Sequence, residues 1–178
     1  MGYRGPQLEK LEASSACSRH STARESLLMK NLYEAGVAKQ VEDRLAQLKP
    51  DSPRQWGKMT PAQAVAHCSG AMEWAVDDCH RPMSMAGRLV GWAVKPLVLK
   101  DDKPLRPGAP TDKSLVMADD RDLEAERLRL CGLIDRFVAS GPKGCTTHPH
   151  AFFGRLTPDE WAILMYKHLD HHLRQFGV

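Results

Sequence analysis

The chain has 178 residues, of which 42% are hydrophobic and 26% are charged, and this length suits one domain with a sizeable core. The composition excludes both an integral membrane protein and a chain that is disordered throughout. Lysine and arginine total 25 against 22 acidic residues, a net charge of +3 spread without a basic run, so the sequence predicts no nucleic-acid partner.

Residues 1–28 contain Gly, Pro and Ser but no sustained apolar period. They predict a flexible N-terminal extension, or a start codon assigned too early, ahead of one domain over residues 29–178. Charged residues interrupt the segment, so it lacks the apolar core of a signal peptide. The sequence contains no run of 18 apolar residues, so it predicts neither a membrane span nor a membrane partner.

The cysteines are odd in number, and no two of them have Cys-X-X-Cys spacing. A disulfide-stapled secreted domain and a thiolate zinc site are therefore disfavoured. We expect buried, reduced thiols and a cytoplasmic protein. The five cysteines are Cys17, Cys68, Cys79, Cys131 and Cys145.

Four segments have the apolar period of a helix. Residues 29–48 repeat apolar side chains at intervals of four and three, and Pro50 follows them. The second helix starts at Thr60, where Gln63 completes a capping box and Pro61 takes the first helical position. We expect it to run to about Cys79.

About forty residues, 81–118, separate the second helix from the third. Within them, residues 83–99 predict a short helix broken at Pro96, and the proline-rich residues 101–113 predict an extended loop. The third helix is expected to begin near Asp119 and to stop at Gly141.

The fourth helix repeats the start signal of the second, with Thr157, Pro158 and Glu160. No alternating strand pattern of useful length accompanies these helices. The sequence therefore predicts an all-α protein, a four-helix bundle with a long crossover between the second and third helices.

Two histidines stand four residues apart on the predicted fourth helix. His168 and His172 project from one face with Cβ atoms roughly 6 Å apart, the spacing at which two imidazoles share a metal ion. They continue the apolar stripe of the helix, so they should point into the bundle, where each imidazole needs a polar partner. A metal site is the favoured interpretation, and two core histidines bonded to neighbouring side chains are the alternative.

A third ligand is required, and His67 in the second helix is the candidate. It lies beside a strip of small residues that leaves room for an ion or a pocket, although a helix-packing seam is the alternative: Ala64, Cys68, Ala71 and Ala75. His171 stands one residue off the favoured face, so we expect it beside the site or at the surface. His148 and His150 precede the fourth helix in a loop, where they line the pocket mouth or are solvated.

Three stretches resemble a known family. They are residues 53–60 (PRQWGKMT) with His67-Cys68 after them, residues 148–157 (HPHAFFGRLT) and residues 166–177 (YKHLDHHLRQFG). Together they resemble a domain-of-unknown-function branch of the DinB-like superfamily, over the chain from about Met29 to Val178. The resemblance implies a four-helix bundle with a metal held by one histidine of the second helix and two of the fourth.

In this sequence the implied ligands are His67, His168 and His172. Gln175 stands three after the last ligand, as in the superfamily's usual His-Arg-Gly-Gln ending, but Leu173 and Arg174 replace the Arg-Gly. Superfamily members with known activity are metal-dependent, and some transfer low-molecular-weight thiols. Gln175 is therefore expected beside the ligands.

The leading hypothesis is a metal-dependent hydrolase or thiol transferase acting on a small molecule, with zinc as the default and Ni, Fe, Mn or Co as alternatives. Basic residues of the crossover either steer an anionic substrate or are simply solvated: Lys95, Lys100, Lys103 and Arg106. The rival hypothesis is a non-catalytic helical protein of stress response or interaction, with a structural metal or none. A homodimer is compatible with both.

Overall fold

The computed structural model describes residues 29–77, 80–109 and 111–178. These residues form five α-helices and no strands, which confirms the all-α prediction: α2 (Val37–Gln47), α3 (Pro61–Val76), α4 (Met85–Leu99), α5 (Leu123–Ser140) and α6 (Pro158–Arg174). None of these helices has both the length and the hydropathy that crossing a membrane requires. The predicted extension, residues 1–28, lies outside the described residues, as does Cys79; the cysteines that the structure describes are free thiols.

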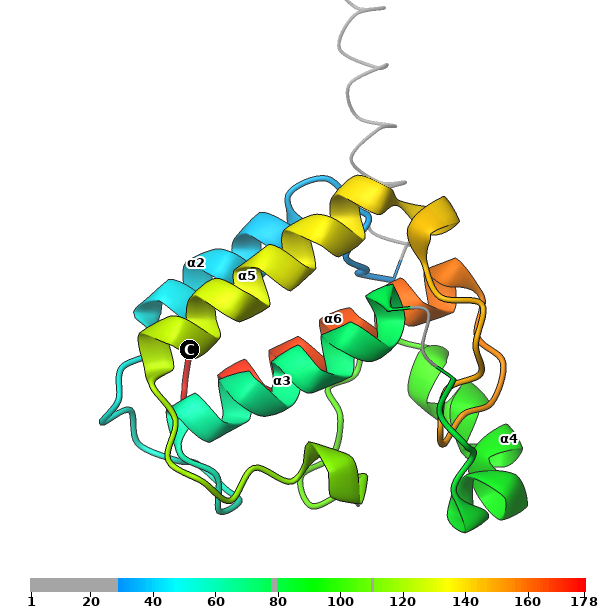
Figure 1. Ribbon diagram of the computed structural model, residues 1–178, viewed down its shortest axis with the longest axis horizontal. Coiled ribbons are helices and arrows are strands. Elements are labelled where there is room, and N and C mark those ends of the chain that lie inside the picture. The colour runs from blue at the N-terminus through cyan, green and yellow to red at the C-terminus, as the bar shows by residue number, and fades with distance from the viewer. Residues whose placement is uncertain (1–28, 78–79, 110) are drawn as a thin grey trace, which may run out of the picture.

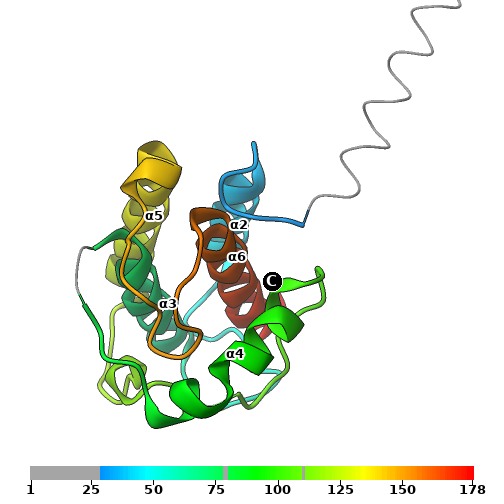
Figure 2. The same ribbon diagram turned by 90° about the vertical axis from the view of Figure 1, so that its right-hand side faces the viewer.

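Four of the helices lie lengthwise against one another (Figures 1 and 2). The helix α3 packs against α5 and α6, and α2 packs against the same two helices from the other side. The fifth helix, α4, lies at the edge of this group and contacts α6. The core therefore lies between α2, α3, α5 and α6.

The helix α3 is the most deeply buried element. Only Gln63 and Glu73 among its residues are not buried. The predicted strip of small side chains, Ala64, Cys68, Ala71 and Ala75, belongs to this core. Small residues let neighbouring helices approach closely, which explains how α3 can pack against two partners at once.

Both predicted capping boxes are present. The Thr60 hydroxyl accepts a hydrogen bond from the Gln63 amide at 3.2 Å, and the Gln63 side chain accepts one from the Thr60 amide at 3.0 Å. Thr157 and Glu160 make the same reciprocal pair at 3.1 and 2.8 Å. The two helices that carry the histidines therefore begin at fixed residues.

The predicted start of the first helix is wrong by two turns. The helix α2 begins at Val37, because Gly36 has a left-handed backbone (φ 84°) that ends any helix before it. The Asn31 side chain also accepts a hydrogen bond from the Tyr33 amide, which holds residues 31–33 in a turn. The start of the third helix is likewise corrected, since Asp122 caps α5 by accepting from the Ala125 amide at 2.7 Å.

The predicted break at Pro96 is wrong as well, because α4 continues through it to Leu99. Proline removes one helical hydrogen bond, but only one turn of helix follows it. That turn is held from outside: the buried Lys167 ammonium donates to the carbonyls of Val98 at 2.6 Å and Asp101 at 2.7 Å. The lysine thus satisfies carbonyls at the end of α4 that have no helical donor.

The glycines of α4 form the face that contacts the rest of the protein. A Cβ atom on Gly91 would lie 2.0 Å from the Phe152 carbonyl oxygen, and one on Gly87 would lie 2.7 Å from the same atom. The helix can therefore rest directly on the backbone of residues 151–153 only because both positions lack a side chain.

We expect Gly91→Ala to lower the free energy of unfolding by about 1–3 kcal/mol, because the new methyl group forces α4 away from Phe152. Gly132→Ala is the matched control, since a Cβ at this α5 position meets nothing within 4 Å. Helix propensity should make that control more stable by about 0.5–1 kcal/mol. Urea unfolding measures both, and equal effects of the two variants would contradict the close contact.

Candidate metal centre

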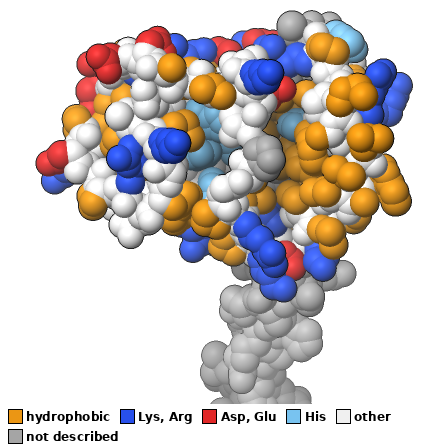
Figure 3. All heavy atoms as spheres, turned by 90° about the horizontal axis from the view of Figure 1, so that it is seen from below, with side chains coloured by type: hydrophobic (Ala, Val, Ile, Leu, Met, Phe, Trp, Pro, Cys, Tyr) orange, Lys and Arg blue, Asp and Glu red, His pale blue; other side chains and the backbone are white. Residues whose placement is uncertain are grey.

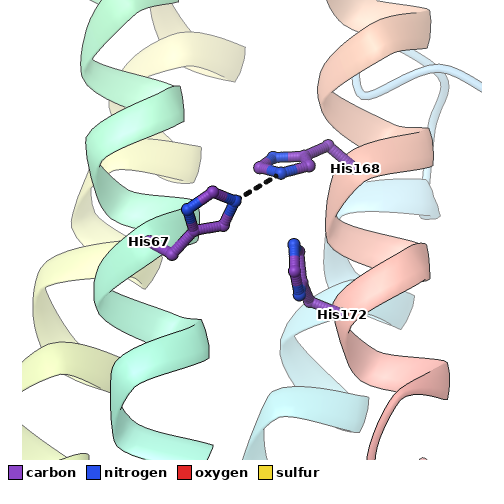
Figure 4. Close-up of side chains that lie close together, drawn as sticks. All are labelled: His67, His168 and His172. Carbon is purple, nitrogen blue, oxygen red and sulfur yellow. Dashed lines mark hydrogen bonds between the residues drawn. The ribbon is translucent and has the colours of Figure 1, made fainter. Parts of the chain in front are cut away.

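Three imidazoles from two helices converge between α3 and α6 (Figure 4). His67 comes from α3, and His168 and His172 come from successive turns of α6. Their ligand nitrogens all lie within 4.8 Å of one another, and the Nε2 atoms of His67 and His168 are 2.9 Å apart. The structure thus brings together the three histidines that the sequence singled out.

The far side of the His67 ring is held by the backbone. Its Nδ1 atom lies 2.9 Å from the carbonyl oxygen of Leu115, and a carbonyl can only accept. Nδ1 therefore carries the proton, and Nε2 of the neutral ring presents its lone pair to the cluster. Leu115 belongs to a short 3-10 turn, Lys113–Leu115, in the connection between α4 and α5.

A glycine of α3 makes room for that turn. The Leu115 side chain is buried, and a Cβ atom on Gly70 would lie 2.8 Å from it. Gly70 stands three residues after His67 on α3. The same stretch of helix therefore presents the imidazole and seats the residue whose carbonyl orients it.

Gln175 holds the His172 ring in the same manner. The His172 Nδ1 atom lies 2.8 Å from Oε1 of Gln175, and Nε2 of Gln175 donates to the Trp56 carbonyl at 2.9 Å. The Trp56 carbonyl can only accept, so it fixes which end of the amide faces the ring. His172 then carries its proton on Nδ1, and its Nε2 is free to bind an ion.

The residue after Trp56 permits this contact. Gly57 has a left-handed backbone (φ 78°), and a Cβ atom there would lie 2.5 Å from the Gln175 amide nitrogen. The backbone of the same loop is tied to the end of α6, since the Gln55 amide donates to the Gln175 carbonyl at 2.8 Å. The sequence motif Gln55-Trp56-Gly57 therefore positions Gln175, a role that the sequence alone did not reveal.

Burial keeps the three imidazoles neutral. Desolvation lowers the pKa of His67, which is only 3% exposed, and holds the pKa of His168 well below its usual range. Desolvation, reinforced by the neighbouring His67, lowers the pKa of His172 to about 3. Neutral rings have lone pairs at neutral pH, which is the state a metal ion requires of its ligands.

The donor set fits a divalent ion. Zinc binds imidazole nitrogen at about 2.0–2.1 Å, so two nitrogens on one ion lie roughly 3–4 Å apart. The closest pair of the cluster is at the short end of this range, and nitrogens up to 4.8 Å apart would have to draw somewhat closer to share one ion. Among the described residues, this is the only group of three or more His, Cys, Asp or Glu side chains with such spacing.

Histidine side chains reach one face of the molecule. Figure 3 shows histidine side chains at the surface in the middle of one face of the molecule, bordered by hydrophobic and basic side chains. His168 and His172 are both partly exposed, whereas His67 is buried.

His171 lies beside the cluster and not within it. Its Nδ1 atom lies 3.2 Å from the Leu105 carbonyl oxygen, and its ring is 5.4 Å from that of Trp56 and 5.0 Å from that of His172. Of the basic crossover residues, Lys95 pairs with Glu160 at 2.8 Å and Lys103 with Asp101 at 3.4 Å. Substrate steering by these residues stays a prediction.

His150 and His148 border a hollow of the surface lined also by Trp74, Arg81 and Trp161. His150 is enclosed by aromatic rings, with centroid distances of 5.3 Å to Trp161 and 5.6 Å to Trp74. Its Nδ1 atom accepts the backbone amides of residues 152 and 153. His150 therefore organises the loop before α6, and it does not belong to the three-histidine cluster.

The family comparison covers most of the chain. Residues 22–177 match the family described as a protein of unknown function, DUF1569, and the chain belongs to that family. No curated protein and no solved structure matches the chain. The family assignment therefore agrees with a domain of unknown function and adds no reaction to what the site itself shows.

His150 should make stability depend on pH. Burial lowers its pKa from 6.5 to about 4, so between these values the unfolded chain binds a proton that the folded chain excludes. Its contribution is fully present above pH 6.5 and is lost as the pH falls toward 4, a loss of about 3 kcal/mol. In His150→Asn the amide oxygen replaces Nδ1 as acceptor, so the variant should lose less stability than the wild type between pH 7 and pH 4.

Urea unfolding at pH 7, 5.5 and 4 measures this difference. His80→Asn is the matched control, because the side chain of His80 is exposed. A loss of stability in acid that is equally steep in the wild type and in His150→Asn would refute the assignment of the protonation to His150.

Proposed function

We propose that the protein is a metal-dependent enzyme in which His67, His168 and His172 bind one divalent ion. The hydrolase and low-molecular-weight thiol transferase reactions are the two candidate classes, and zinc is the default metal. One observation carries the proposal: three imidazole nitrogens from two helices converge, and two of the rings are turned toward the common point by hydrogen bonds on their far sides.

We also propose that the fold is the DinB-like four-helix bundle. Support comes from the three sequence stretches that resemble this superfamily and from the mutual packing of α2, α3, α5 and α6. The long connection between α3 and α5, which contains α4, corresponds to the expected crossover. In this assignment one ligand belongs to the second bundle helix and two, four residues apart, belong to the fourth.

A divalent ion held by three neutral imidazoles keeps its full charge and an open position, and supplies the Lewis acidity that activates a bound water or thiol. The chain's own residues supply the rest of the site. Leu115 and Gln175 orient the ligand rings, and imidazole donors also suit Ni, Fe, Mn or Co. We propose that Trp56 and His171, whose rings lie 5.4 Å apart beside the cluster, contact a bound small molecule.

We propose a cytoplasmic location, and the thiols support it. Cys68, Cys131 and Cys145 are free, and burial raises the pKa of each, most of all that of Cys68. Protonated, unpaired thiols suit a reducing compartment, which supports the proposal of a cytoplasmic enzyme. Cys68, adjacent to His67, belongs to the core and is not proposed as a ligand.

A second candidate function rests on the shortest contact of the cluster. A separation of 2.9 Å between Nε2 of His67 and Nε2 of His168 is also the length of a hydrogen bond, with His168 as the donor. The pair would then stabilise the core without any ion, as in a non-catalytic helical protein of interaction or stress response. Metal content separates the two candidates.

The purified wild-type protein should bind one equivalent of Zn²⁺ per chain, because the three Nε2 atoms form one site. His168→Ala should lower the affinity at least 100-fold, because it leaves two protein ligands. His148→Ala is the matched control and should bind like the wild type, since His148 is outside the cluster. Isothermal titration calorimetry with zinc measures the affinities, and elemental analysis measures the bound metal.

Binding that His168→Ala leaves unchanged would contradict the site, and a wild type without measurable affinity would favour the non-catalytic candidate. The melting temperature separates a structural ion from a catalytic one. Removal of a structural ion should unfold the domain. Removal of a catalytic ion should leave the domain folded, with only a modest decrease in melting temperature.

Gln175→Met should weaken zinc binding about 10- to 100-fold, because methionine fills the space but cannot hold Nδ1 of His172. The control is Gln47→Met, at an exposed position of α2, which should leave the affinity unchanged. Competition with a chromophoric chelator measures both affinities. Equal affinities of the two variants would show that the Gln175 contact does not orient the ligand.

A further inference from the structure

The helix α4 exposes large apolar side chains. Five of the eight exposed large hydrophobic residues in the described part of the chain belong to this one helix: Met85 (71% exposed), Leu89 (70%), Val90 (46%), Trp92 (75%) and Leu97 (62%). We call these five residues the α4 patch. Figure 3 shows a broad hydrophobic area on the side of the molecule where α4 lies.

The direction of the patch follows from the inner face of the helix. Because Gly87 and Gly91 contact the backbone of residues 151–153, the bulky side chains of α4 point away from the protein. Met85, Leu89, Trp92 and Pro96 then repeat at intervals of four, three and four along the outer face. This is the spacing with which one helix packs along another helix.

We propose that the α4 patch is the interface with a second copy of this chain, in a two-fold symmetric dimer. In an antiparallel pair of α4 helices centred between residues 89 and 92, each Leu89 faces Trp92 of the second copy and each Met85 faces Pro96 of the second copy. Every facing pair along this seam is apolar with apolar. The patch is therefore complementary to itself, as a two-fold interface requires.

The exposed apolar area of the α4 patch matches the area that a dimer interface buries. With about 150–250 Å² for a fully exposed large side chain, the five exposed fractions sum to roughly 600 Å². A stable dimer buries about 800 Å² per partner, of which about 65% is apolar, or roughly 500 Å². The largest apolar patch of an ordinary monomer is about 300–600 Å², so the α4 patch is at the upper limit for a surface that stays uncovered.

Polar groups around the patch favour a protein partner over a lipid surface. The indole Nε1 of Trp92 donates to the Leu89 carbonyl at 3.1 Å, so the ring can be covered without leaving an unpaired donor. Lys95 and Lys103 are paired with Glu160 and Asp101, which offsets part of the positive charge that would attract anionic lipid. Arg88, at the edge of the outer face, can keep its guanidinium in solvent.

Analytical ultracentrifugation between 1 and 100 µM tests the dimer with the full chain. The wild type should sediment with twice the 19.9 kDa mass of one chain. Leu89→Glu should be monomeric throughout this range, with a dimer dissociation constant raised at least 100-fold, because two carboxylates would enter the seam. Leu128→Glu, at a 75% exposed position of α5, is the matched control and should remain dimeric.

Far-UV circular dichroism checks that each variant folds, and Trp92→Gln serves as the second variant if Leu89→Glu aggregates. A wild type that is monomeric at 100 µM would overturn the proposal, and so would a dimer that survives both α4 substitutions. Co-sedimentation with phosphatidylserine vesicles that is lost in Leu89→Glu, from a monomeric wild type, would assign the patch to lipid. Metal binding does not enter this test, so its outcome is independent of the proposed activity.

Discussion

Two hydrogen bonds on the outer sides of the imidazoles determine what the cluster can do. An imidazole in the core can present either nitrogen, and a neutral ring has a lone pair on only one of them. The Leu115 carbonyl holds the proton of His67 on Nδ1, and the Gln175 side chain does the same for His172. Both rings consequently present Nε2 lone pairs to the space between α3 and α6, while desolvation disfavours protonation of these nitrogens.

These two contacts connect segments that are distant in the chain. Leu115 belongs to the connection between α4 and α5 and is seated against Gly70 of α3. Gln175 follows α6 and is held by the loop of Trp56 and Gly57, which precedes α3. The geometry of the histidines therefore depends on three pieces of irregular backbone outside the helices that carry them, and each approach requires a glycine or a free backbone carbonyl.

The sequence predicted several features that are formed by residues close to one another in the chain. The spacing of His168 and His172, the capping boxes at Thr60 and Thr157 and the stop at Gly141 involve residues within one or two helical turns of one another, and the structure shows each of these features. Features that depend on distant partners were missed or misplaced, and so were two local ones, the helix starts set by Gly36 and by Asp122. The helix through Pro96 depends on Lys167 of α6, and the orientation of His67 depends on a carbonyl 48 residues away. The motif around Trp56 was noticed, but only the folded chain shows that it positions Gln175.

His168 differs from the other two histidines in its hydrogen bonding. This difference explains how the cluster can be either a hydrogen-bonded pair without an ion or a set of three metal ligands. Within the described residues its ring makes one hydrogen bond, through Nε2 to Nε2 of His67, and its Nδ1 atom has no hydrogen-bond acceptor to hold a proton there. Because Nε2 of His67 is an acceptor in this pair, His168 must carry its proton on Nε2 when no ion is bound. Moving that proton to Nδ1 turns the third lone pair toward the other two. A change of tautomer in one ring thus separates a hydrogen-bonded core from a three-nitrogen donor set.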